Sequence, residues 1–307
     1  MKLTMRNYHD ESDYWRIREF LREVLILNNL RELSWGVSRL DYWRFFGMVS
    51  IHPFDNLPNI ISLWETADRK IVAVLNPEEP GDNFMQIHPT FKTKVLEEEM
   101  ISTAEERLYI MRNGKKKLFL WADSQDFQRQ ELLKIHGFTN TNWTESQWRR
   151  DLDQPIPDYP IAEGYTIRSL GDESELPARS WASFRGFHPN EPVENYQGWD
   201  WYHNIQRCPL YRRDLDLVAA TGDVIAAIAT FWFDDVTRTA YIEPVATVPE
   251  HQRRGLQKSI LNEGLRRLQR LGAVRVFVGG YEPGPNALYS SMLSPVCDYS
   301  VSWMKEW

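Results

Sequence analysis

The hydrophobic and polar positions along the chain predict the same order of elements in each half. Short stretches that alternate or are wholly apolar predict strands, and longer stretches with helical spacing predict helices. In the first half we expect strands near the start and at 59–65, 70–75, 83–87 and 117–121, a last pair of strands that ends at Arg150, and helices at 13–30, 94–112 and 127–136. In the second half we expect strands at 165–170, 215–220, 224–233, 241–248, 274–278 and 299–307, and helices at 172–184, 256–271 and 286–292. The shared order suggests an old duplication.

Strands mixed with helices in this order are typical of an α/β fold, in which a mixed central sheet carries helices on both faces. The segment DLDQPIPDYPIAEGY, residues 151–165, contains three prolines and little periodicity, so it predicts an extended linker. We therefore expect two tandem domains of this type, at 1–150 and 164–307, joined by a linker at 151–163.

A polar turn, QRRGLQ at 252–257, lies between an expected strand and an expected helix. The helix has one apolar stripe, formed by Ile260, Leu261, Leu265, Leu268 and Leu271, and Gly272 ends it. A helix N-terminus offers unpaired N–H groups and partial positive charge, which suit an anion. Gly255 allows an anion close to the backbone, and Arg253 and Arg254 add positive charge. The turn alone is equally compatible with a surface role, because many strand-to-helix turns carry Arg and Gly.

The surroundings of this turn resemble the GNAT acyltransferase superfamily. The family motif, [Gln/Arg]-x-x-Gly-x-[Gly/Ala], lies between the fourth strand and the third helix, and 252–257 match it except that Gln257 replaces the small residue. Pro249 matches the Val-x-Pro that precedes the family motif. NALYSSM at 286–292 resembles the family's Leu-Tyr helix, although LSPVCDY follows where the family has Gly-Phe. The resemblance covers 164–307 and implies that the chain binds an acyl-coenzyme A, with acetyl-CoA as the default donor.

The resemblance assigns donor-binding roles to two groups of residues. Splayed fourth and fifth strands would leave backbone groups of Val245, Ala246 and Thr247 free to pair with the pantetheine amides, as an added strand would. The residues expected to form the pyrophosphate turn are Gln252, Arg253, Arg254, Gly255, Leu256 and Gln257. Gln257 would either crowd the phosphate or point out along the helix. Asn286 would bind the coenzyme A chain, or it would serve equally well as a helix N-cap.

The first half has a different sequence at the equivalent junction. It reads IHPTFKTKVLEEEM, residues 87–100, with no glycine and with three glutamates in the following helix. A pyrophosphate would meet no close backbone approach and a concentration of negative charge. HGF at 136–138 still resembles a family helix ending. The resemblance therefore implies a degenerate GNAT domain that has lost the coenzyme, in a tandem arrangement similar to that of mycothiol synthase.

Acyl transfer from a thioester to an amine needs a base for the ammonium and an acid for the departing thiolate, and direct transfer needs no Ser or Cys nucleophile. Tyr289 matches the family's thiolate-protonating tyrosine; alternatively, it packs its helix against the sheet. Glu243 lies on the fourth strand, where many family members keep a base; alternatively, it pairs with an arginine and only holds the sheet. Strand alternation places Tyr241, Glu243 and Val245 on one face. Pro244 favours a β-bulge beside Glu243.

The stretch WASFRGFHPNEPVENYQGWDWYH, residues 181–203, is expected to cover the acceptor side of the cleft. Aromatic walls with a few acids suit a cationic amine, through cation–π and charge contacts. The side chains expected to bind the acceptor are Tyr241, Glu191, Trp199 and Trp201. The acids of the stretch, Glu191, Glu194 and Asp200, are the next candidate bases, and His188 and His203 lie among them. A well-packed pair of surface helices would explain the stretch equally well.

Composition narrows the function further. The formal net charge of −7 argues against a protein that binds nucleic acid through phosphate contacts. The two cysteines, Cys208 and Cys297, cannot form a disulfide framework. Charged residues within the first twenty positions argue against a signal peptide. The longest apolar run, 224–233, is too short for a membrane span. We therefore expect a soluble cytoplasmic protein without a metal site. The sequence predicts an acetyl-CoA-dependent N-acyltransferase acting on a primary amine of a small molecule or peptide. The alternative is a catalytically silent coenzyme A-binding or scaffolding protein.

Overall fold

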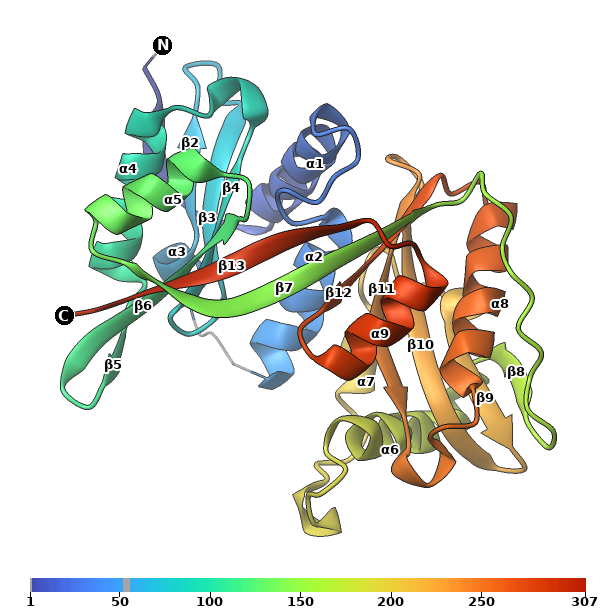
Figure 1. Ribbon diagram of the computed structural model, residues 1–307. Helices are drawn as coiled ribbons and strands as arrows, with labels where there is room; N and C mark the ends of the chain where they lie inside the picture. The colour runs from blue at the N-terminus through green and yellow to red at the C-terminus, as the bar shows by residue number, and fades with distance from the viewer. Residues whose placement is uncertain (1, 52–55) are drawn as a thin grey trace. The chain divides into compact units, whose positions relative to one another are not determined.

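Two units make up the chain in the computed structural model, which describes residues 2–51 and 56–307 (Figure 1). The N-terminal unit contains Met1–Gln147 and Asp298–Trp307, and the C-terminal unit contains Trp148–Cys297. From the sequence we expected a boundary at 150 and the last strand in the second domain. The structure instead gives the last strand to the first unit, because that strand pairs with a strand of the N-terminal sheet.

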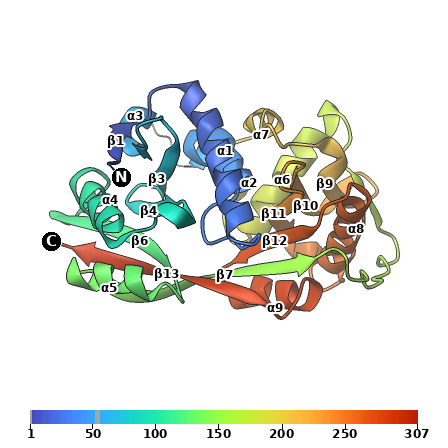
Figure 2. The same cartoon turned by 90° about the horizontal axis from the view of Figure 1, so that it is seen from above.

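The N-terminal unit is a mixed sheet with helices on both faces (Figure 2). Its strands are β1 (Thr4–Asn7), β2 (Ser62–Glu65), β3 (Ile71–Glu79), β4 (Asp82–Ile87), β5 (Ile110–Arg112), β6 (Lys115–Asp123), most of β7 (Thr139–Asp151), and β13 (Cys297–Glu306). They follow the order β1-β2-β3-β4-β6-β13-β7, with β5 paired to β6. Its helices are α1 (Glu11–Leu27), α2 (Val37–Tyr42), a π-helical stretch (Trp43–Ile51), α3 (Leu57–Ile60), α4 (Lys94–Arg107) and α5 (Phe127–Ile135).

Each face of this sheet has its own core. Buried residues of α1, including Ile17, Leu21 and Val24, pack on one face. Met100 and Ile101 of α4 pack on the other face, together with residues of α5. The helical spacing of these apolar positions explains why the pattern predicted both α1 and α4.

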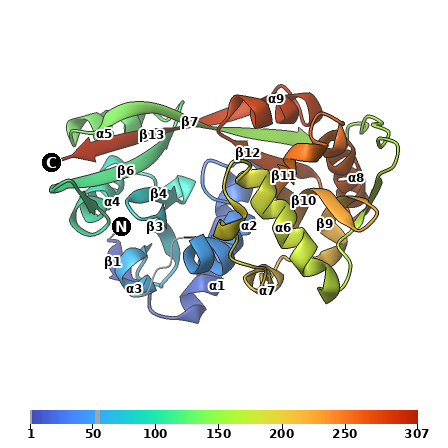
Figure 3. The same cartoon turned by 90° about the horizontal axis from the view of Figure 1, so that it is seen from below.

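The C-terminal unit repeats the same architecture, with α6 and α7 on one face and α8 and α9 on the other (Figure 3). Its strands are the end of β7, β8 (Thr166–Ser169), β9 (Asp216–Thr221), β10 (Val224–Asp234), β11 (Thr239–Thr247) and β12 (Arg275–Gly280), in the order β7-β12-β11-β10-β9-β8. Its helices are α6 (Leu176–Phe187), α7 (Tyr202–Gln206), α8 (Leu256–Arg270) and α9 (Pro283–Met292). The mixed α/β fold and its duplication are therefore confirmed.

Helix α8 carries the predicted apolar stripe, and four of its members are fully buried: Ile260, Leu261, Leu265 and Leu268. Leu271 is the exception, because it is the C-cap and is 36% exposed. Gly272 follows in the left-handed conformation, with φ of 82°, and ends the helix as predicted. The stripe packs on β9, β10 and β11 and fixes where the helix begins relative to the strands.

Two predicted elements of the N-terminal half were wrong. The helix expected at 94–112 ends at Arg107, and its last part is strand β5. Asn113 and Gly114 both have positive φ and form a two-residue turn between paired Arg112 and Lys115, which is the strongest short hairpin signal a sequence carries. The pair of strands expected before 150 is the single strand β7. In the described part of the chain, no helix combines the length and the apolar character needed to cross a membrane.

Candidate active site

The C-terminal sheet opens between β11 and β12. These parallel strands pair only at Thr239–Tyr241 with Arg275–Phe277, although β11 continues to Thr247. On its other side β11 stays paired with β10: Ala246 lies opposite Ile228, and the N–H of Val248 donates to the Ala226 carbonyl at 3.0 Å. Because an antiparallel strand directs alternate residues to one neighbour, Val245 and Thr247 turn their backbone groups to the open side and Ala246 turns its groups to β10.

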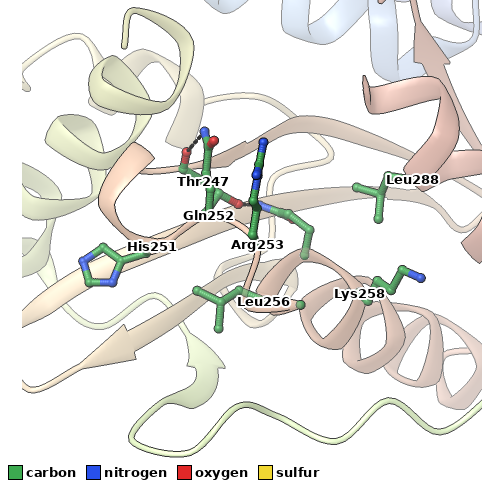
Figure 4. A pocket seen from close by; sticks show the side chains of 9 residues that line it. Thr247, His251, Gln252, Arg253, Leu256, Lys258 and Leu288 are labelled. Atoms are coloured by element: carbon green, nitrogen blue, oxygen red, sulfur yellow. Dashed lines mark hydrogen bonds between the residues drawn. The ribbon is translucent and has the colours of Figure 1, made fainter. Parts of the chain in front are cut away.

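The open edge leads into the turn before α8. Arg253 and Gly255 both adopt the left-handed conformation, with φ of 60° and 77°, and Gly255 is the N-cap of α8 without a capping side chain. A Cβ at Gly255 would meet no atom within 4 Å. The first N–H groups of α8 are therefore open to an anion. A pocket of about 200 Å³ lies at this turn (Figure 4). Its lining residues are Thr247, His251, Gln252, Arg253, Gly255, Leu256, Gln257, Lys258 and Leu288.

Gln257, which departs from the family motif, folds back onto β11. Its Nε2 donates to the carbonyl of Ala246 at 2.5 Å, to the carbonyl of Ile228 at 3.2 Å and to Oγ1 of Thr247 at 3.0 Å. Gln252 adds a bond from its own Nε2 to the Thr247 carbonyl at 3.3 Å. Gln257 thus neither points out along α8 nor stands free in the turn. It fastens the first turn of α8 to the end of β11.

The equivalent helix terminus of the N-terminal unit is closed. Thr93 is the N-cap of α4 and its side chain accepts from the N–H of Leu96 at 3.2 Å. Glu97, in the first turn, is fully buried and forms an ion pair with Arg129 at 2.8 Å. An anion at this terminus would compete with the Thr93 oxygen and would face the Glu97 carboxylate.

The splay of the N-terminal sheet is filled by aromatic side chains. Strands β4 and β6 pair only at Asp82–Phe119 and Asn83–Leu120. The next residues, Phe84 and Trp121, stack across the gap with ring centroids 5.7 Å apart and an interplanar angle of 8°. Arg39 lies 4.8 Å from the Phe84 ring. The N-terminal unit therefore keeps the strand geometry but not an open edge.

The two predicted catalytic residues, Tyr289 and Glu243, lie close enough to influence each other electrostatically. Tyr289 of α9 is 6% exposed. Burial raises the pKa of its phenol, and the negative charge of Glu243 raises that pKa further. Gly280, at the end of β12, allows α9 to pack closely on this strand, because a Cβ there would lie 2.3 Å from Oδ1 of Asn286 and 3.2 Å from the Tyr289 ring. The phenol therefore keeps its proton at neutral pH.

The β-bulge favoured by Pro244 is present and changes which side chains share a face. Ala229 pairs with Val245 but Phe231 pairs with Ile242, so β11 carries one extra residue at 243–244, where the Glu243–Pro244 peptide is cis. As a result Ile242 and Val245 both pack on the core beneath α8. The expected shared face of Tyr241, Glu243 and Val245 was therefore wrong, because simple alternation does not hold across a bulge.

Tyr241 and Asn286 both have roles in holding the fold. The phenol oxygen of Tyr241, a buried side chain, accepts from the N–H of Gly279 at 3.1 Å and so links β11 to β12 beyond their last paired residues. Asn286 lies inside α9, whose N-cap is Glu282, so its alternative as an N-cap was wrong. Its Oδ1 accepts from the indole N–H of Trp148 at 2.8 Å.

Comparison with known proteins identifies the domain that carries this geometry. Residues 175–289 match the acetyltransferase (GNAT) family. The C-terminal unit contains a GNAT acetyltransferase domain. Nothing among curated proteins matches the chain.

Solved structures resemble the chain over nearly its whole length. A GCN5-related N-acetyltransferase from Sphaerobacter thermophilus is 16% identical, with 99% of this chain and 95% of that chain covered and a TM-score of 0.67. A tandem GNAT protein from the clavulanic acid biosynthesis pathway is 12% identical, with 99% and 98% covered and a TM-score of 0.64. A GNAT-family acetyltransferase from Colwellia psychrerythraea is 9% identical, with 98% of each chain covered and a TM-score of 0.61. At these identities the likeness establishes the tandem GNAT fold.

Of the expected acceptor residues, Tyr241 lies on β11, whereas Glu191, Trp199 and Trp201 lie in the segment between α6 and α7. Glu191 is exposed and bonds to Nδ1 of His188 at 2.8 Å and to Asn195 at 3.2 Å. The rings of Trp199 and His203 lie 5.5 Å apart. The indole N–H of Trp201 donates to the Gly198 carbonyl at 2.9 Å.

Sequence reasoning missed a buried polar cluster beneath α6. Arg179 of α6 and Asp216 of β9 are both fully buried, with Nε and Oδ1 3.4 Å apart. The hydroxyls of Tyr202 and Tyr211 donate to the other carboxylate oxygen of Asp216. The sequence feature that could have indicated this cluster is Asp216, an aspartate at the start of the otherwise apolar strand β9. This cluster ties α6 and α7, which carry the expected acceptor residues, to the sheet of the GNAT domain.

Three residues that line the pocket were also missed: His251, Lys258 and Leu288. His251 and Lys258 directly flank the motif in the sequence, and Leu288 lies in the stretch at 286–292 that resembles the family's Leu-Tyr helix. This proximity to the two motifs was the signal available. The described residues contain no group of three or more His, Cys, Asp or Glu side chains placed to hold a metal ion.

Proposed function

We propose that this chain is an acetyl-CoA-dependent N-acyltransferase that moves an acetyl group directly to a primary amine of a small molecule or peptide. The observation that carries the proposal is the contrast between the two units. The turn before α8 is open and flanked by cations, whereas the turn before α4 is capped by Thr93 and its splay is filled by Phe84 and Trp121. The open turn with its flanking cations favours a bound anion over a purely scaffolding role.

The donor would lie along the open edge of β11. Backbone groups of Val245 and Thr247 suit the pantetheine amides, as in strand addition. The first N–H groups of α8, with Arg253 and Arg254, suit the pyrophosphate. We expect one donor per chain, held by the GNAT domain alone.

Glu243 and Tyr289 would divide the proton transfers. Glu243, through a bridging water, would take the proton that the ammonium loses. The amine nitrogen then bonds to the thioester carbonyl carbon and the C–S bond breaks. Tyr289 would give its proton to the departing thiolate, which its raised pKa supports because the phenol stays protonated at neutral pH.

The bulk properties support the remaining expectations. A net charge of −7 supports a small-molecule or peptide acceptor over nucleic acid. Cys208 and Cys297, both in the described part of the chain, form no disulfide bond, which is consistent with the reducing cytoplasm that we propose as the location.

The test is thiol release from acetyl-CoA across a panel of polyamines, aminoglycosides, amino acids and peptides, beside calorimetric titration of acetyl-CoA. We expect one site per chain, and at 100 times the Kd a stabilisation of about 2.7 kcal/mol. Gly255→Glu should abolish binding, because it places a carboxylate at the open turn. Two sites, or unchanged binding in that variant, would refute the proposed donor site. Binding without thiol release for any amine would instead indicate a silent coenzyme A-binding protein.

A further inference from the structure

Three cations, Arg253, Arg254 and Lys258, lie at or next to the open turn of the GNAT domain. Among the described residues, Arg253, Arg254 and Lys258 form no ion pair. Farther along the same helix, Arg266 pairs with Asp158 at 3.1 Å and Arg267 pairs with Glu263 at 2.7 Å. The positive charge near the pocket is therefore left uncompensated by the protein itself, which favours an anionic ligand of high charge.

The Pro-rich segment expected to be a linker holds these basic side chains in place. Nζ of Lys258 lies 5.4 Å from the ring centroid of Tyr159, and Ser259 donates to the Pro160 carbonyl at 3.1 Å. The guanidinium of Arg254 lies 6.0 Å from the ring of Tyr165. Aromatic faces attract cations and limit their conformations, so the cations around the pocket are partly ordered before a ligand binds.

The hydroxyl of Tyr165 also forms a hydrogen bond with Nδ1 of His251, at 2.8 Å. His251 lines the pocket on the strand side of the turn, and Lys258 lines it on the helix side (Figure 4). Two tyrosines of one segment thus support basic side chains on both sides of the pocket. The segment lies within the C-terminal unit and is part of the site.

The number of cations exceeds what a pyrophosphate needs. A pyrophosphate diester carries about two negative charges, which the N-terminus of α8 and the two arginines can match. Lys258 remains, and coenzyme A carries one further phosphate, the 3′-phosphomonoester, with about −1.5 to −2 charge at neutral pH. We propose that Lys258, held over Tyr159, binds the 3′-phosphate of coenzyme A, so that the site distinguishes acetyl-CoA from acetyl-dephospho-CoA. This inference rests on the proposed donor site.

The test is a cycle of two ligands and matched variants, measured by calorimetric titration of the full chain. Acetyl-CoA and acetyl-dephospho-CoA differ only in the 3′-phosphate. Wild type should bind the dephospho ligand about tenfold more weakly, which corresponds to one charge-assisted contact. Lys258→Met keeps the aliphatic stem and should bind both ligands with equal affinity, at the wild-type affinity for the dephospho ligand. Tyr159→Leu should reduce the tenfold ratio between the Kd values of the two ligands by a factor of about three.

Lys94→Met is the matched control, because Lys94 lies in the first turn of α4 and pairs with Glu98 at 3.7 Å. It should keep the tenfold discrimination. Melting temperatures should show that every variant is folded. Equal binding of both ligands by wild type would overturn this inference and leave the donor site intact. An equal loss for both ligands in Lys258→Met would also overturn it, since Lys258 would then contact a group that the two ligands share. No binding of either ligand to wild type would overturn the proposed function itself.

Discussion

Gly186→Ala is a direct test of how closely α6 approaches the open edge of β11. A Cβ at Gly186 would lie 2.6 Å from the Cβ of Ala246 and 3.4 Å from the backbone nitrogen of Thr247. Two carbon atoms normally approach to about 3.5–4.0 Å, so the helix and the strand must separate by roughly 1 Å. Overpacking of this kind costs about 1–3 kcal/mol, and alanine recovers at most about 1 kcal/mol through its helix propensity.

We therefore expect a net destabilisation of about 0–2 kcal/mol, which lowers the melting temperature by at most about 8 °C for a unit of this size. Donor affinity should fall more clearly. A displaced Thr247 would weaken the backbone bonds that we assign to pantetheine, each worth about 1 kcal/mol, so the Kd for acetyl-CoA should rise about tenfold or more. Thermal unfolding measures the first effect and calorimetric titration measures the second.

Gly47→Ala is the control, because a Cβ at Gly47 would lie 3.4 Å from the Trp43 side chain, an ordinary contact, in the other unit. It should change the melting temperature little and leave donor affinity unchanged. If Gly186→Ala bound acetyl-CoA with wild-type affinity while remaining folded, the assignment of the β11 edge as the pantetheine site would be refuted.

Three further changes test the catalytic pair and a partly buried carboxyl group. Tyr289→Phe removes only the proton donor, so kcat should fall by roughly 10²-fold while calorimetry gives an unchanged Kd for acetyl-CoA. Full activity in this variant would mean that Tyr289 only packs its helix against the sheet. Glu243→Gln should lower activity most near pH 7 and recover partly at high pH, where the amine loses its proton unaided, whereas an equal loss at every pH with a lower melting temperature would mean that Glu243 is structural. Burial raises the pKa of Asp82 to about 7, and the negative charge of Glu78 adds to this. Between about pH 4 and pH 7 the folded state therefore keeps a proton that the unfolded state loses, and stability falls as the pH rises. The free energy of unfolding of Asp82→Asn, measured with denaturant, should equal that of wild type near pH 4. Above pH 7 it should be larger by up to about 4 kcal/mol, at 1.36 kcal/mol per pKa unit. Parallel pH profiles of the two proteins would contradict this.

The sequence alone determined the elements that depend on local patterns. The apolar stripe of α8, the adjacent strands at 215–220 and 224–233 and the order of strands and helices follow from side-chain spacing, which acts over a few residues. The open turn at Gly255 was also predicted, because a glycine before an amphipathic helix has few alternatives to a terminus without a capping side chain. Even the bulge at Pro244 was accessible, since proline cannot donate to a strand ladder.

Only the tertiary structure decided which distant groups meet. A strand pattern does not specify its partner, so the sequence could not show that β13 pairs with β6 in the N-terminal unit, with Trp303 opposite Leu120. The extra residue at the bulge moves Val245 to the core face, which alternation alone misplaced. The close packing of Asn286 and Tyr289 against Gly280 depends on α9 lying on β12, and the burial of Arg179 with Asp216 depends on α6 packing on the sheet. Such contacts are set by the packing of elements far apart in the chain, and local propensity carries no information about them.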